Sequence, residues 1–198
     1  MLARGLRFAL AALAICAGVA VADEIEVRTA DLAATDEGIV FNGDFEFELT
    51  ARLEDALAKG VPLYFLVEFE SYRPRWYWFD DRIGSATLTL RLSFHALTRT
   101  YRLSTGALHR SYPTLADAIN ALTRIREWLV LPRGALRPDT TYHAYVRMRL
   151  DTAQLPKPFQ VSALANREWT LASPWKRWDV NGSAFAAAEA PGPAEAPR

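Results

Sequence analysis

The sequence has only one cysteine, Cys16, and this residue lies in the N-terminal segment. A chain whose later residues carry no thiol suits an oxidising compartment and offers no cysteine nucleophile. The three histidines, His95, His109 and His143, form no H-E-x-x-H motif, and no G-x-S-x-G elbow is present. We therefore expect a protein that is not an enzyme, with no catalytic residue, no metal site and no cofactor.

The sequence also lacks an excess of charge, because 23 Lys and Arg residues balance 23 Asp and Glu residues. This balance differs from the basic footprint of nucleic-acid-binding proteins, so we expect no nucleic-acid partner. Beyond residue 22, no apolar run approaches the roughly 20 residues that a transmembrane helix needs. We therefore expect no transmembrane segment in the mature chain.

The first residues are typical of a cleavable export signal. Arg4 and Arg7 precede an unbroken apolar run over residues 8–22, and Ala20-Val21-Ala22 has the small-x-small pattern that signal peptidase recognises. An uncleaved anchor is the alternative, although anchors usually lack this ending. We predict a signal peptide over residues 1–22 and a mature chain that begins at Asp23.

Between the two ends, polar and apolar side chains alternate with a period of two, which predicts strands with one wet face. The pattern is clearest over residues 85–96, whereas residues 61–69 are more continuously apolar and predict a central strand. The other alternating segments are residues 24–28, 45–49 and 142–150.

Two segments have helical rather than alternating spacing. Residues 50–59 have Thr50 as a cap and stop before Gly60, and residues 114–126 begin with a T-x-x-D cap. The last residues are mostly Ala, Pro, Glu and Gly, so we expect a disordered tail over residues 181–198. One domain, residues 23–180, remains.

Residues 136–142 have the form L-x-P-x-T-x-Y and lead directly into the alternating segment 142–150. This motif resembles the corner before the F strand of fibronectin type III and other immunoglobulin-like domains, in which a tyrosine hydroxyl bonds to the upstream backbone. Together with the short strands, it predicts a mainly β fold: an immunoglobulin-like antiparallel β-sandwich with two short helices.

A second resemblance covers roughly residues 23–178. The segments that carry it are Trp76-Tyr77-Trp78 with Asp80-Asp81, residues 97–103, residues 142–151 with Leu155-Pro156-x-Pro158, and residues 169–175. In these segments the chain resembles the proteobacterial exported proteins of domain-of-unknown-function family 4390. The resemblance implies a periplasmic protein of the Gram-negative envelope that is linked to a membrane sensor kinase, and it implies no catalytic residues.

Arginine and aromatic residues gather in the segment 72–82 and on the outer face of the predicted strand 142–150. Such residues dominate protein interfaces, although large aromatics also fill cores. We predict an interaction surface with the alternative that the aromatics are buried. Its residues are Arg73, Arg75, Trp76, Tyr77, Trp78, His143, Tyr145, Arg147 and Arg149.

Charge is unevenly placed, since acids dominate residues 23–81 and arginines dominate residues 91–149. Acidic and basic strands can pair across the sheet, which needs no partner. The alternative is that the arginines form a basic surface that binds an acidic partner or anionic lipid. The arginines in question are Arg91, Arg99, Arg102, Arg147 and Arg149.

Two acidic pairs have chemical interpretations of their own. Glu68 and Glu70 share a strand face and could act as a general acid and base, or lie on a solvated edge. Asp80 and Asp81 could share a cation if they lie in a loop.

We expect a binding or accessory module that acts through protein–protein contact with an envelope protein of unknown identity. Residues 169–178 mix tryptophan with cations, which suits either a peripheral membrane contact or a last strand that closes the core. Two other classes stay open. A deep apolar pocket would favour a carrier or sensor of a small or lipid ligand, and clustered His and carboxylates with perturbed pKa values would favour a hydrolase.

Overall fold

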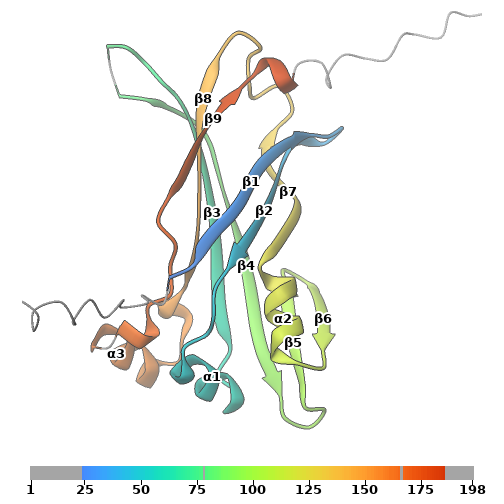
Figure 1. Ribbon diagram of the computed structural model, residues 1–198, viewed down its shortest axis with the longest axis vertical. Helices are drawn as coiled ribbons and strands as arrows, with labels where there is room; N and C mark the ends of the chain where they lie inside the picture. Colours follow the sequence, from blue (N-terminus) through green and yellow to red (C-terminus); the bar gives the residue numbers. More distant parts are fainter. Residues whose placement is uncertain (1–23, 78, 166, 186–198) are drawn as a thin grey trace, which may run out of the picture.

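The computed structural model describes residues 24–77, 79–165 and 167–185. The predicted signal peptide, Trp78 and the tail beyond Phe185 lie outside the described residues. Within the described part, the strands form two antiparallel sheets (Figure 1). The smaller sheet has the order β1 (Glu26–Ala34), β2 (Gly38–Glu46), β7 (Arg124–Pro132).

The larger sheet has six strands, and the predicted central strand lies inside it. Its order is β6 (Leu108–Tyr112), β5 (Thr100–Thr105), β4 (Asp81–His95), β3 (Leu63–Arg73), β8 (Thr141–Leu150), β9 (Lys176–Asn181). Figure 1 shows β1 and β2 crossing one face of this sheet. We call the opposite side of the six-stranded sheet the outer face.

The core lies between the two sheets. Phe41 of β2 packs against Phe69 of β3 and Trp178 of β9, with ring centroids 6.3 Å apart in both pairs. Along β3 and β8, buried residues alternate with half-exposed ones, as the period of two predicts. The predicted antiparallel β-sandwich is therefore confirmed.

The strand order can be compared with that of an immunoglobulin variable domain. β9, β8, β3 and β4 are neighbours in the order of strands G, F, C and C′ of immunoglobulin variable domains, and β1, β2 and β7 occupy the other sheet, as strands A, B and E do. The tyrosine of the L-x-P-x-T-x-Y motif lies at the start of β8, the strand in the F position. Kinship with immunoglobulin or fibronectin type III domains stays a prediction.

Tyr142 makes the contact that the motif predicts. Its side chain is 1% exposed, and its hydroxyl oxygen accepts a hydrogen bond of 2.9 Å from the backbone N–H of Arg137. Gly182 closes the corner from the other side, because its N–H donates to the Thr140 carbonyl and a Cβ there would overlap the Arg137 carbonyl oxygen. Phe185 is buried in the core, so the packed part of the domain extends beyond residue 180.

Three α-helices occur in the described part, one more than predicted. α1 (Ala51–Ala58) begins as expected, because the Thr50 side chain accepts a hydrogen bond from the N–H of Leu53. α2 (Leu115–Leu122) also begins at its predicted cap, but it ends earlier because residues from Arg124 onward join β7. The third helix, α3 (Lys157–Ala165), lies between the short 3-10 helices η1 (Thr152–Gln154) and η2 (Arg167–Trp169).

Candidate functional site

The two segments predicted to form an interaction surface lie on neighbouring strands. β3 pairs with β8 so that Glu70 is opposite Tyr145 and Tyr72 is opposite His143. Because side chains alternate along a strand, Glu70, Tyr72, His143 and Tyr145 all project from the outer face. These residues are far apart in the sequence, and the register between β3 and β8 brings them together.

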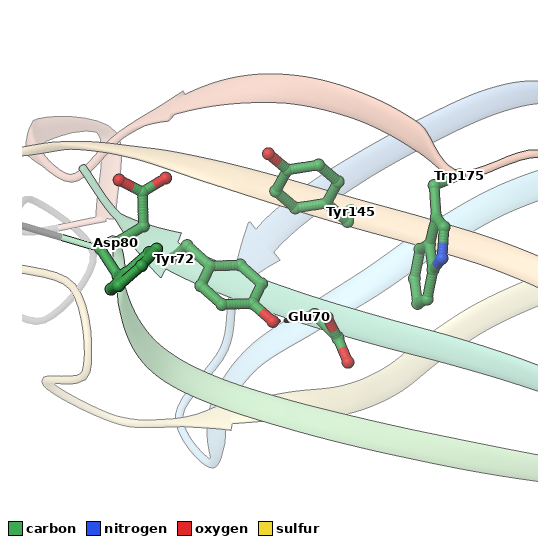
Figure 2. A pocket seen from close by; sticks show the side chains of 6 residues that line it. Glu70, Tyr72, Asp80, Tyr145 and Trp175 are labelled. Atoms are coloured by element: carbon green, nitrogen blue, oxygen red, sulfur yellow. Dashed lines mark hydrogen bonds between the residues drawn. The ribbon is translucent and has the colours of Figure 1, made fainter.

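A hollow of about 690 Å³ lies where these strands meet the loop between β3 and β4. Figure 2 shows the rings of Tyr72 and Tyr145 between Asp80 at one end and Trp175 at the other. The two tyrosine rings are perpendicular, with centroids 5.7 Å apart. The lining residues are Glu70, Tyr72, Phe79, Asp80, Tyr145 and Trp175, and we call this set the aromatic–acidic hollow.

The two carboxylates give this hollow its charge. The Tyr72 hydroxyl donates a hydrogen bond of 2.7 Å to Glu70, and this bond, together with burial, raises the pKa of Tyr72. Asp80 accepts a long hydrogen bond of 3.4 Å from the backbone N–H of Arg75. Arg82 approaches Glu70 to 3.8 Å, but none of the described lining residues is basic.

Aromatic faces combined with carboxylates favour a cationic ligand, because the negative face of each ring and each carboxylate attract positive charge. One cation–π contact already exists at the edge of this hollow. The guanidinium of Arg147 lies over the Trp175 ring, 4.4 Å from its centroid. The arrangement therefore suits a second guanidinium, an ammonium group or a quaternary ammonium group.

The arginines of the predicted surface have partners within the chain. Arg73 and Arg75 both bind Asp81, and their hydrogen bonds lower the pKa of this carboxyl. Arg147 and Arg149 both bind Glu68, at 2.5 and 3.1 Å. The cross-sheet pairing interpretation therefore holds for Arg147 and Arg149, and the charged side chains among the described lining residues of the hollow are acidic rather than basic.

His143 lies outside the hollow. Its Nδ1 is 2.7 Å from the carboxylate of Asp179, and the guanidinium of Arg177 is 3.1 Å from its Nε2. Both partners belong to the adjacent strand β9. Of the predicted residues on β8, only Tyr145 lines the hollow.

Trp76 and Tyr77 of the predicted aromatic cluster lie in the loop at the tip of the β3–β4 hairpin. Trp76 is 92% exposed, Phe79 is 84% exposed, and Trp76 and Tyr77 contact each other edge to face. The alternative that these aromatics fill the core does not apply to Trp76 or Tyr77. Residues 74–77 lie in the loop between β3 and β4, so strand alternation does not set the direction of their side chains.

The ion pairs of Glu68 argue against the interpretation of Glu68 and Glu70 as a general acid and base. Partial burial raises the pKa of Glu68, but hydrogen bonds from Arg149 and Arg147 outweigh it, so the net pKa is lowered. A general acid needs the opposite shift. Asp81 is occupied by two arginines, and the described residues contain no group of three or more potential metal ligands.

The tryptophans near the end of the domain divide between core and surface. Trp169 is 2% exposed, and Trp178 packs against Phe41 and Phe69, so both help to close the core. Trp175 differs, because it is 37% exposed and lines the hollow. Sequence reasoning missed Trp175, Tyr72 and Phe79 as site residues, although alternation along β3 could have placed Tyr72 beside Glu70.

A family model described as Domain of unknown function (DUF4390) matches residues 22–179. No curated protein and no solved structure matches the chain. Among the helices of the described residues, none has the length and apolar character to cross a membrane.

Proposed function

The chain belongs to the DUF4390 family, and we propose that it is a non-enzymatic binding module of the bacterial envelope. In this proposal a protein partner docks on the outer face and places a cationic side chain in the aromatic–acidic hollow. The observation that carries the proposal is the composition of this hollow, which has four aromatic rings and two carboxylates. The Arg147 contact with Trp175 supports arginine as the ligand side chain.

The hairpin tip supports a protein partner over a free small molecule. Trp76 and Tyr77 are exposed, and Phe79 and Asp80 of the same hairpin loop line the hollow. Trp, Tyr and Arg are the side chains that contribute most to protein interfaces. A partner that places a side chain in the hollow could therefore also contact Trp76 and Tyr77 beside it.

A carrier function has less support. The volume of the hollow falls within the range of small-ligand sites, about 300 to 1,000 Å³. However, none of the described residues that line the hollow belongs to the buried core, whereas a carrier for an apolar ligand would enclose the ligand among core residues.

An exported protein would meet its partner in the periplasm, and the membrane sensor kinase that the family resemblance suggests is the first candidate. A photo-crosslinking residue in place of Tyr77 can capture the partner in native envelopes for identification. We expect the double variant Glu70→Gln/Asp80→Asn to weaken binding of the identified partner about tenfold. The two substitutions remove the negative charges of the carboxylates but keep the size and shape of the side chains.

The matched control is Asp36→Asn/Glu37→Gln, which removes two charges from the exposed turn between β1 and β2. Titration with N-acetylarginine amide, followed by NMR signals of Tyr145 and Trp175, tests the hollow without the partner. Equal partner binding by both double variants would contradict the proposal. Capture of a small quaternary ammonium compound, with no protein partner, would favour the carrier instead.

A further inference from the structure

A second hollow on the outer face has the opposite charge. It has a volume of about 640 Å³, and its lining includes two arginines, Arg91 and Arg102, and two histidines, His95 and His109. No carboxylate is among its described lining residues. From Arg82 to Ala116 the chain contains no acidic residue, so β5, β6 and nearly all of β4 bring no negative charge to this region.

The strand register brings these groups together. One row across the sheet contains Tyr64, Arg91, Ser104 and His109, on β3, β4, β5 and β6. The next row contains Ser93, Arg102 and Ser111. Side chains that are directly opposite on one face have Cβ atoms about 5 Å apart, so two guanidiniums, an imidazole and several hydroxyls converge.

These arginines differ from those of β8 in having no acidic partner. Arg147 and Arg149 bind Glu68, but neither Arg91 nor Arg102 forms an ion pair with a carboxylate of the described residues. The guanidinium carbon of Arg91 lies 5.8 Å from the centroid of the Tyr64 ring. A ring in this position orients a guanidinium without neutralising it.

We propose that this hollow is a binding site for a phosphate group. Arginine forks and hydroxyl donors match the terminal oxygens of a phosphate, and a phosphate monoester also carries more charge than a carboxylate. The inference does not rest on the proposed function, because the two hollows share no lining residue. Along β3, Tyr64 and Glu70 are about 20 Å apart, so one small headgroup cannot reach both hollows.

The phosphate can belong to a soluble ester or to a lipid headgroup, and the first arm of the test uses a soluble probe. Glycerol 3-phosphate is titrated into the protein while backbone NMR signals of β4, β5 and β6 are followed. We expect saturable shifts, and an affinity at least about tenfold lower for Arg91→Gln/Arg102→Gln. Unchanged affinity in this double variant overturns the proposal, as does acetate that binds as tightly as the phosphate ester.

Arg110→Gln is the control. It removes one positive charge where the double variant removes two. Arg110 is opposite Leu103, whose side chain packs toward the core, so Arg110 lies on the other side of the sheet. The control should bind glycerol 3-phosphate with the affinity of the parent. An equal loss of affinity in both variants would mean that net charge alone explains binding, and it would overturn the proposed site. Unfolding midpoints of the variants show that each is folded.

The second arm distinguishes the two sources. Cosedimentation with phosphatidylcholine vesicles is compared with cosedimentation with vesicles that also contain phosphatidylglycerol. Binding only to the latter, lost in Arg91→Gln/Arg102→Gln, assigns the phosphate to a lipid headgroup. Saturable binding of glycerol 3-phosphate without vesicle binding assigns it to a soluble ester, and failure of both arms overturns the proposal.

Discussion

Replacing Tyr142 with phenylalanine removes one oxygen atom from a ring that is 1% exposed. That oxygen accepts the hydrogen bond of 2.9 Å from the backbone N–H of Arg137. A hydrogen bond of this kind contributes about 0.5 to 1.5 kcal/mol net. Because this hydrogen bond is only partly buried, we expect a loss of about 1 kcal/mol rather than the larger cost of a fully buried orphan donor.

Urea denaturation measures this loss directly. For a small domain the dependence on urea is about 1 to 3 kcal/mol per M, so a loss of about 1 kcal/mol lowers the midpoint by roughly 0.3 to 1 M at unchanged slope. Tyr142→Ala also removes the buried ring and should cost about 3 to 5 kcal/mol. The ratio of the two losses separates the hydroxyl from the packing of the ring.

Tyr77→Phe is the control, because Tyr77 is 66% exposed and its loss of a hydroxyl should leave the midpoint unchanged. Gly182→Ala tests the same corner from the opposite side, since the added methyl group would overlap the carbonyl oxygen of Arg137. If Tyr142→Phe unfolds at the midpoint of the parent while Tyr142→Ala is destabilised, the hydroxyl contributes nothing. The corner would then be explained by ring packing alone.

Two further predictions concern acid stability and processing. The pKa of Glu68 is lowered from its ordinary value of 4.5, so its ion pairs stabilise the fold above that pH and this contribution is lost as the pH falls through the lowered pKa. Glu68→Gln should cost about 1 to 2 kcal/mol at pH 7 and reduce the loss between pH 7 and pH 3 in urea titrations, whereas Glu37→Gln should do neither; equal pH dependence in parent and Glu68→Gln would contradict this. Mass spectrometry of envelope fractions should find a mature N-terminus at Asp23, and a chain that keeps Met1 in the inner membrane would refute cleavage.

The parts of the fold that could be predicted are those in which local chemistry and tertiary packing agree. Alternation predicted β4 and β8 because each has one face in the core and one in solvent. The end of α2 could not be predicted, because Ile125 continues the helical apolar stripe equally well. In the structure Ile125 reaches the core from β7 instead. α3 was missed because its apolar residues form only a weak amphipathic pattern.

The candidate site was less predictable, because it depends on pairings between distant strands. Composition alone singled out Trp76, Tyr77 and Tyr145, and two of these, Trp76 and Tyr77, are exposed at the hairpin tip. That Glu70 is opposite Tyr145 follows only from the β3–β8 register. Trp175 comes from a segment before β9 and reaches the hollow after the chain has passed through α3, so no local pattern connects it with Tyr72.

Strand order decides which of the arginines noted in the sequence have partners. β8 carries Arg147 and Arg149, and it lies beside β3, where Glu68 is the acidic residue opposite Arg147. β4 and β5 carry Arg91 and Arg102, and the hairpins that join β4, β5 and β6 keep these strands adjacent in a stretch that has no acid between Arg82 and Ala116. A distant strand can bring a counter-charge, whereas neighbouring hairpins of the same composition cannot. The same charge segregation along the chain therefore gives neutralised arginines on β8 and unneutralised ones on β4 and β5, where an external anion would find them.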